Sequence, residues 1–412
     1  MKAGTGFCND EDSFYSGKKA GEDAIKSGRI NRPDLVFAFC SGSLDHQKFF
    51  SGLQSVVGKG VPIIGGSTIG IITNENLSYK GYPSGAAILQ SDNFRLIIDS
   101  AGDLNMDEKT AGMNLAAKLK KKLQEESEAL NNCMIIFYDS VKSPGNLTTP
   151  PVLNASSPLI AGIEQKLGHG VNIFGAGLIG EFDLGQTKQF CGSCVATQNL
   201  VGAIFAGDFK HYFRIMHGCT PLDGVYHTIT KIKGSAIYEL DGKPIVEIID
   251  NLYGNKNWRN QNPVDLLTIG VNHGKRYEET LESNYVNRLI TGVLPEEEGI
   301  GIFEPDLWAG TEIQFMLRDG EKMIESARRN SEELMQQIFD KGEKPCFGLY
   351  INCAGRAAEY SKTFTEEASE VQKVFNKYDT PLFGFYSGVE VAPFLQKSRG
   401  LDWTGVLLVF AV

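Results

Sequence analysis

The feature that most constrains the fold is a glycine-bearing pattern that occurs three times along the chain. In each copy an apolar run ends at a glycine, and a second glycine follows within a few residues. The copies read VPIIGGSTIGI at residues 61–71, VNIFGAGLIGE at residues 171–181 and TPLFGFYSGVE at residues 380–390. A pattern that recurs in similar surroundings predicts a repeated unit with a glycine loop, so we expect the chain to fold from three related units.

The sequence around each copy supports this expectation. Upstream of each glycine loop lies a short apolar run, rich in β-branched and aromatic residues, which is typical of a buried strand. These runs are residues 35–39, 134–138 and 347–351. One helical pattern precedes each of these strands, and another lies between the strand and the glycine loop. The expected helices cover residues 13–27, 46–57, 107–130, 159–167, 320–339 and 365–377.

The order of the elements predicts an α/β fold with mixed sheets. A strand–helix–strand connection within one sheet is almost always a right-handed parallel crossover. The apolar strands after the glycine loops are close enough to pair as antiparallel hairpins. We therefore expect mixed parallel and antiparallel sheets, covered by helices and built from repeated α-β-α-β-β(β) units. The strands expected after the glycine loops are residues 85–89, 95–98, 202–206, 212–216 and 406–412.

One long segment interrupts the repeat. Residues 219–318 contain strand patterns in which polar and apolar residues alternate, and these patterns predict a β-rich insertion. We accordingly expect two domains. The first, residues 1–218, holds two copies of the repeat. The second, residues 219–412, holds the insertion and then the third copy at residues 319–412.

Composition and charge exclude several classes of function. The 412 residues are 42% hydrophobic and 22% charged, as in an ordinary globular protein, and no apolar stretch is long enough to span a membrane. A net charge of −10 without a basic face excludes a nucleic-acid-binding surface. Residues 1–11 lack the apolar core of a signal peptide. We expect a cytoplasmic protein that neither inserts into membranes nor binds nucleic acid.

Two short motifs resemble cofactor sites but lack the context that such sites need. Cys191 and Cys194 form a CxxC pair on a strand-and-turn pattern, whereas redox-active pairs sit at a helix start, and a zinc site needs two more ligands. Residues 175–180 match GxGxxG, yet no helix pattern follows and Glu181 would bring an anion close to a bound phosphate. We expect no cofactor, no metal and structural cysteines, and a redox or metal role for the CxxC pair stays open.

The third copy carries the densest group of polar residues. Its first expected strand ends at Cys353, followed by Arg356, and its second ends at Tyr386 and Ser387, followed by Glu390. Neighbouring parallel strands would place both ends at the carboxyl edge of one sheet, where α/β proteins bind ligands. Arg356 offers a fork for a carboxylate and Glu390 an acceptor for an ammonium group, which together suit an amino-acid-like zwitterion. The alternative is a structural ion pair between Arg356 and Glu390.

The second copy carries a related acid. Glu181 stands there at the position of Glu390 in the third copy, while the first copy has Ile71. Copies two and three are therefore expected to share a role that copy one lacks. The candidate ligand-binding residues are Cys353, Arg356, Tyr386, Ser387, Glu390 and Glu181.

Several segments match a known family. In the first half these are residues 62–70, GAIFAG at residues 202–207 and GCTP at residues 218–221. In the second half YELDGKP at residues 238–244 and CAGR at residues 353–356 are the most specific. Over nearly its whole length the chain resembles FIST-domain proteins, with a FIST N-like part followed by a FIST C-like part. Further matching segments are ITK at residues 229–231, NR at 287–288, EE at 366–367 and GFYS at 384–387.

The resemblance implies a sensory protein that binds a small ligand, with amino acids as the ligand class. It also implies a signal that passes to a separate protein partner, and it supplies no catalytic residues. The chain departs from the family pattern at Val389, where the family has a glycine before the glutamate. We therefore expect the loop backbone and the direction of Glu390 to differ from the family.

Three functions are consistent with these observations. The leading one is a cytoplasmic small-molecule sensor. The second is an enzyme in which Cys353 is the nucleophile, Arg356 favours its thiolate and Glu390 serves as acid or base, although no histidine lies nearby in sequence. The third is a protein-interaction scaffold, which would show a large exposed apolar patch and no pocket.

Overall fold

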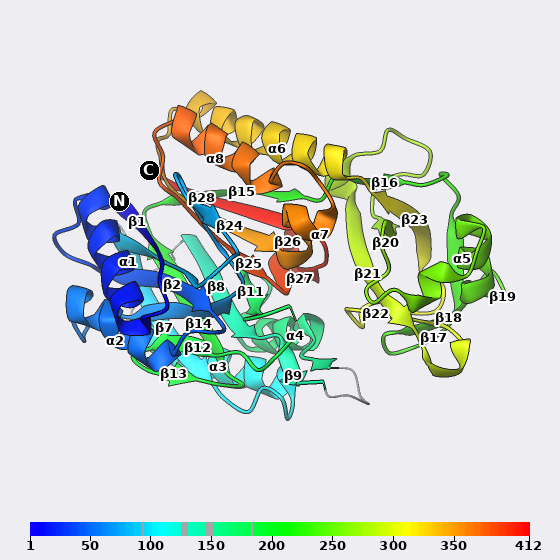
Figure 1. The fold of residues 1–412 in the computed structure, drawn as a ribbon, viewed down its shortest axis with the longest axis horizontal. Helices are drawn as coiled ribbons and strands as arrows, with labels where there is room; N and C mark the ends of the chain where they lie inside the picture. Colours follow the sequence, from blue (N-terminus) through cyan, green and yellow to red (C-terminus); the bar gives the residue numbers. More distant parts are fainter. Residues whose placement is uncertain (93, 125–130, 146–150, 183) are drawn as a thin grey trace.

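Three mixed sheets form the body of the protein in the computed structural model, which describes residues 1–92, 94–124, 131–145, 151–182 and 184–412 (Figure 1). The first sheet has the order β1 (Lys2–Asn9), β6 (Pro83–Gln90), β2 (Leu35–Ser41), β3 (Ile63–Thr68), β12 (Gln189–Gly192) and β13 (Val195–Ala196). The second has the order β7 (Phe94–Ala101), β14 (Leu200–Gly207), β8 (Asn131–Asp139), β11 (Asn172–Leu178), β26 (Val389–Phe394) and β27 (Lys397–Leu401). The third has the order β15 (Lys210–Met216), β28 (Gly405–Ala411), β24 (Pro345–Cys353), β25 (Leu382–Ser387), β4 (Ile71–Thr73) and β5 (Leu77–Ser78).

The three sheets share one pattern of pairing. The two central strands of each sheet are parallel: β2 and β3, β8 and β11, and β24 and β25. All other neighbouring strands of the three sheets are antiparallel. Each sheet ends in a hairpin that comes, in the sequence, directly after a strand of another sheet. The hairpin β12–β13 of the first sheet follows β11 of the second, β26–β27 of the second follows β25 of the third, and β4–β5 of the third follows β3 of the first. This exchange brings the carboxyl ends of the three parallel pairs together. Backbone hydrogen bonds join Gly42 N to Gly180 O (3.2 Å), Gly388 N to Gly177 O (2.9 Å) and Tyr386 N to Gly70 O (3.2 Å).

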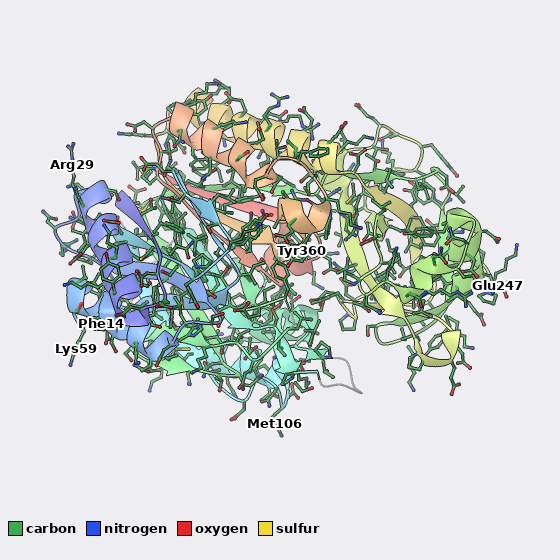
Figure 2. The ribbon with its side chains drawn as sticks, viewed as in Figure 1. Phe14, Arg29, Lys59, Met106, Glu247 and Tyr360 are labelled. Carbon is green, nitrogen blue, oxygen red and sulfur yellow. The ribbon has the colours of Figure 1, made fainter. Side chains whose placement is uncertain are left out.

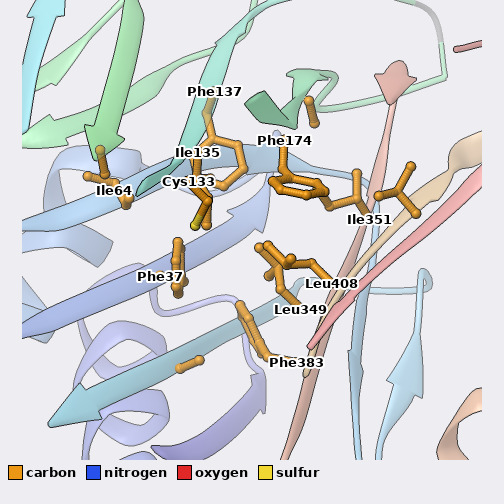
Figure 3. Packing of buried hydrophobic residues seen from close by; sticks show 14 of the residues in the cluster. Phe37, Ile64, Cys133, Ile135, Phe137, Phe174, Leu349, Ile351, Phe383 and Leu408 are labelled. Carbon is orange, nitrogen blue, oxygen red and sulfur yellow. The ribbon is translucent and has the colours of Figure 1, made fainter. Parts of the chain in front are cut away.

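Helices cover the outer faces of the sheets, and the inner faces share one apolar core. Phe37 of the first sheet, Phe137 of the second and Leu408 of the third meet in this core (Figure 3). Burial of these large side chains on all three inner faces fixes the sheets to one another. The covering helices are α1 (Ser13–Gly28) and α2 (His46–Val57) on the first sheet, α3 (Glu108–Gln124) and α4 (Ser156–Leu167) on the second, and α6 (Gly320–Asp340) and α8 (Glu367–Lys377) on the third.

The expected α/β fold with mixed sheets and covering helices is confirmed. The three strand–helix–strand segments form parallel pairs, as the crossover rule predicts. The six expected helices lie within a few residues of the observed ones. The end of the helix expected at residues 107–130 falls at residues 125–130, which lie outside the described residues.

The first glycine of each copy differs from the expectation, because it lies inside a strand and not in a loop. The second glycines lie outside strands, as expected: Gly70 and Gly388 lie between two strands, and Gly180 follows the end of β11. Gly65, Gly175 and Gly384 occupy the same place in the three parallel pairs, each opposite a residue of the neighbouring strand. A Cβ atom at Gly65 would lie 2.1 Å from the Ala38 carbonyl oxygen, and one at Gly175 would lie 1.9 Å from that of Ile136. The backbone φ values of +134° and +146° at these two positions also favour glycine. Close approach of two strands, and not a turn, explains the first glycine of each copy.

Residues 219–318, which we call the insertion, form a closed antiparallel sheet between β15 and α6, seen at the right of Figure 1. The strands pair in the order β23, β17, β18, β22, β21 and β20, and β20 pairs again with β23 to close the ring. Trp258 and the apolar face of α5 (Ile245–Tyr253) pack into its core. The strands are β16 (Cys219–Pro221), which extends β23, β17 (His227–Lys233), β18 (Ala236–Leu240), β19 (Lys243–Pro244), which pairs with β18, β20 (Leu267–Asn272), β21 (Tyr285–Val293), β22 (Ile300–Ile302) and β23 (Glu312–Arg318).

Candidate functional site

Five of the six candidate residues lie in one region at the carboxyl edge of the third sheet. β24 and β25 are parallel, and Cys353 lies opposite Ser387. Arg356 follows β24 directly, and Glu390 lies on β26, which follows β25. Cys353 is 8% exposed, whereas Arg356, Ser387, Glu390 and Tyr386 are fully buried. The two strand ends do meet, but they meet in the interior of the protein.

The carboxylate partner of Arg356 is Glu367, at the start of α8, and not Glu390. Arg356 Nη2 donates to Glu367 Oε1 at 2.9 Å, and its Nε donates to Asn352 Oδ1 at 3.1 Å. Its Nη1 donates to the backbone carbonyls of His217 (3.2 Å) and Trp403 (3.3 Å). Burial acts to lower the pKa of Arg356, but the Glu367 carboxylate, together with Tyr350 and Cys353, outweighs burial and the pKa is raised. The ion pair considered for Arg356 and Glu390 is therefore replaced by one with Glu367.

Glu390 has its own buried partners. Its Oε2 accepts a hydrogen bond from the Thr404 N–H at 3.2 Å, and its Oε1 lies 2.8 Å from Ser387 Oγ, which lies 3.1 Å from the Asn352 carbonyl oxygen. Burial raises the pKa of Glu390 well above its usual range. A neutral carboxylic acid fits this series of hydrogen bonds, because the acid hydroxyl can donate to Ser387 Oγ while the Ser387 hydroxyl donates to the Asn352 carbonyl oxygen. In that state Glu390 offers no charge to an ammonium group.

Glu181 lies apart from the other five residues. Its carboxylate accepts hydrogen bonds from the hydroxyls of Ser43 (2.6 Å) and Ser41 (3.5 Å). It lines a shallow hollow with Ser43 and Phe182, and the Phe182 ring stacks on Tyr360 with a centroid distance of 3.7 Å. Tyr360, labelled in Figure 2, belongs to the short helix α7 (Ala358–Ser361). The expected equivalence of Glu181 and Glu390 is wrong in position, because Glu390 lies within a strand and Glu181 does not.

A larger cleft, with a volume of about 750 Å³, opens between α6 and the insertion. One wall is α6, a second is the chain from the end of β15 to β16, and a third is the segment that precedes β21. The turn after β26 lies along its edge. The polar residues of the lining include Arg214, Thr220, Glu279, Glu282, Lys322, Glu325, Ser326, Arg329, Asn330 and Glu333.

A carboxylate already sits in the wall of this cleft. Glu282, which precedes β21, accepts hydrogen bonds from the backbone N–H groups of His217 and Gly218, the latter at 2.6 Å. Three side chains of α6 complete its surroundings: Ser326 Oγ at 2.7 Å, Arg329 Nη2 at 3.1 Å and Asn330 Nδ2 at 3.2 Å. We call these five donors the carboxylate cradle.

Arg356 supports the cradle through one peptide group. The carbonyl of His217, which accepts from Arg356 Nη1, belongs to the same peptide unit as the Gly218 N–H that donates to Glu282. A cation on the carbonyl side polarises the peptide and strengthens its N–H as a donor. The predicted residue Arg356 therefore acts behind the cleft wall and not on its surface.

Cys353 should be inert towards alkylating reagents in the folded protein. Burial raises the pKa of its thiol, and the nearby Glu390 adds to the effect. At neutral pH we expect iodoacetamide to label Cys353 at least roughly a hundredfold more slowly than a reactive thiol, because the thiolate is the nucleophile. Cys194, which is exposed, serves as the internal reference in peptide mass analysis. Rapid stoichiometric labelling of Cys353 would favour the enzyme hypothesis.

Among the described residues, no three His, Cys, Asp or Glu side chains gather in a way that could hold a metal ion. None of the helices in the described part of the chain is long and apolar enough to cross a membrane.

A body of helix-covered mixed sheets with a cleft beside an insertion defines an α/β protein with a candidate small-molecule site. The chain belongs to the FIST family: the FIST N domain matches residues 34–243 and the FIST C domain matches residues 246–393. FIST domains are sensory domains that bind small ligands in signalling proteins. The recognition made from the sequence is thereby confirmed.

One curated relative is the uncharacterized protein MJ1623 of Methanocaldococcus jannaschii, which is 22% identical over 413 residues, covering 94% of this chain and 71% of that protein. Among solved structures, PurLQS from Thermotoga maritima (10% identity, TM-score 0.21) and T. maritima PurL complexed with FGAR (8% identity, TM-score 0.23) each cover 99% of this chain and 72% of theirs. Structural likeness at this level supports no conclusion about fold or activity.

Sequence reasoning missed two acids that organise this region. Glu367 belongs to the pair Glu366–Glu367, which helped to identify the family. Its place at the start of an expected helix did not indicate that its side chain would pair with a buried residue. Glu282 stands in a polar stretch of the insertion, where an acid is ordinarily a solvated residue. Only the long-range packing of the insertion against α6 brings Glu282 to its five donors.

Proposed function

We propose that the protein is a cytoplasmic sensor that binds an amino acid or a related zwitterion in the cleft between α6 and the insertion, and that it signals through a separate protein partner. The sensory class of the FIST family supports this function. The observation that carries the proposal is the cleft itself, whose volume of about 750 Å³ falls in the range of small-molecule sites. Such sites often lie where two parts of a protein meet.

The charges around the cleft suit both ends of a zwitterion. Arg329 and Lys322 extend from α6 and would attract a carboxylate, whereas Glu279 and Glu333 would attract an ammonium group. In this proposal the buried cluster around Arg356 holds the cleft wall in shape and does not touch the ligand.

A thermal-shift panel of amino acids and related metabolites tests the proposal. A ligand at a hundred times its dissociation constant should add about 2.7 kcal/mol to the stability of the protein. Arg329→Ala should weaken binding at least about tenfold, since a hydrogen bond to a charged group contributes about 1.5–3 kcal/mol.

Arg32→Ala is the matched control, because Arg32 is also an exposed arginine, pairs with Asp92 at 2.6 Å and does not line the cleft. Binding should be unchanged in this variant. Absence of a shift with every amino acid, or an equal loss of binding in the two variants, would contradict the proposed site.

A further inference from the structure

The carboxylate cradle has the composition of an anion-binding site. Its donors come from two parts of the body, the chain after β15 and one face of α6, and the insertion supplies only the acceptor. A carboxylate has about four lone-pair positions, so five donors saturate it. We propose that the cradle is the carboxylate-binding subsite of the cleft, an inference that rests on the function proposed above. Glu282 is an occupant of this subsite that the chain itself supplies, and a ligand carboxylate replaces it.

The cradle keeps its shape without Glu282. Arg356 holds the His217 carbonyl, and the Cys219 N–H donates to His217 Nδ1 at 2.9 Å, which fixes the direction of the peptide between residues 217 and 218. Because Nδ1 is an acceptor, Nε2 carries the proton and donates to the Glu282 carbonyl oxygen at 3.0 Å. Ser326 is buried on the rigid helix α6. A site formed in advance costs little to fill.

The occupant faces the cleft and can leave it. The Glu282 side chain is 13% exposed, and it lines the cleft together with Gly218 and the three donors of α6. The segment that carries it is open to solvent, with Tyr277 83% and Leu281 49% exposed. A ligand in the cleft therefore reaches the same donors, and little packing opposes release of the segment.

The charge state of Glu282 agrees with this role. Burial acts to raise the pKa of Glu282, but the hydrogen bonds from Ser326 and from the backbone N–H groups of Gly218 and His217 favour the charged form, and the pKa is lowered. The side chain is thus an anion at neutral pH, as a ligand carboxylate is.

A second buried acid of the insertion differs from Glu282, because it is held at a position away from the cleft. Glu304, which follows β22, is fully buried and accepts four hydrogen bonds from the N–H and hydroxyl groups of Ser156 and Ser157 at the start of α4, at 2.6–3.1 Å. This contact anchors the insertion away from the cleft, since Glu304 does not line it. Replacement of Glu282 by a ligand would free one side of the insertion while the other stays anchored, and a partner protein could read that change.

Chemical rescue tests the proposal, with acetate as the probe. Glu282→Ala empties the cradle, so sodium acetate at about ten times its dissociation constant should raise the melting temperature of this variant by about 2 °C relative to sodium chloride of equal ionic strength. The wild-type protein, with its cradle occupied, should show no such rise. Trypsin should cleave after Lys275 or Arg276 at least about tenfold faster in Glu282→Ala than in wild type, because the segment is no longer tied down.

Glu247→Ala is the matched control, since it removes the same charge from an exposed position of the insertion that neither contacts the cradle nor lines the cleft. It should show neither effect. If Glu282→Ala does not fold, Glu282→Gln takes its place: an amide cannot match five donors, so faster cleavage and a smaller acetate shift are expected.

A folded Glu282 variant without an acetate shift, or with wild-type cleavage rates, overturns the proposal. The outcomes also distinguish a failure of the cradle proposal from a failure of the proposed sensor function. An acetate shift in Glu282→Ala with no amino-acid shift in wild type keeps the carboxylate site and rejects the zwitterion sensor. The reverse result keeps the sensor and rejects the role of Glu282.

Discussion

Replacement of Arg356 with alanine is expected to lower the free energy of unfolding by about 3–5 kcal/mol, the cost of leaving one member of a buried ion pair without its partner. Glu367 would stay buried with only Tyr350 and Asn352 as neutral donors. Two backbone carbonyls would also lose their donor. Arg356→Lys should recover little, because one ammonium group cannot reach acceptors placed around a planar fork. Urea denaturation followed by circular dichroism measures the loss.

The control for this prediction is Glu390→Gln. A neutral glutamic acid and a glutamine have nearly the same shape, and the amide can accept from Thr404 and donate to Ser387 as the acid does. The change in stability should stay below about 1 kcal/mol, in line with an exchange of equivalent hydrogen bonds. Equal losses in Arg356→Ala and Glu390→Gln would mean that Arg356 depends on Glu390 after all.

Gly175→Ala is expected to prevent folding of the body. The new methyl group would lie 1.9 Å from the Ile136 carbonyl oxygen of the neighbouring strand, and the backbone φ of +146° is one that alanine rarely adopts. β8 and β11 would have to separate at the centre of the second sheet, so we expect a loss of more than about 4 kcal/mol, which is exceptional for one substitution. Soluble yield and circular dichroism of the purified variant report the outcome.

Gly60→Ala provides the comparison. No atom lies within 4 Å of a Cβ at this position, and its φ is not positive. Its stability should change by no more than about 0.5 kcal/mol, as for ordinary surface substitutions. A Gly175→Ala protein that folds as well as Gly60→Ala would refute the close approach of the two strands.

Local patterns in the sequence were sufficient to predict the elements and their parallel pairs. Helical periodicity located α3 and α6, and apolar runs located β2, β8 and β24, because these signals depend on residues close in sequence. The exchange of hairpins among the sheets and the closure of the insertion depend on contacts between distant segments, and no local pattern encodes them. The division of the chain at residue 218 stays a prediction, and so does the relationship among the three repeated units.

The site shows the same limit. The sequence placed Arg356 and Glu390 at neighbouring strand ends, but charge pairing is decided by which acid the fold buries beside the guanidinium, and that acid is Glu367. Glu181 was matched to Glu390 by its distance from a glycine. In the second copy the next strand begins only at Gln189, whereas in the third it begins at Val389, so the two acids belong to different structures.

The most direct test of the account is a crystal structure of the protein grown with the amino acid that gives the largest thermal shift. We predict electron density for the ligand in the cleft, its carboxylate within hydrogen-bond distance of the Gly218 N–H and Ser326, with Arg356 still paired to Glu367. A ligand held between Arg356 and Glu390, or one bound in the hollow beside Glu181, would contradict it.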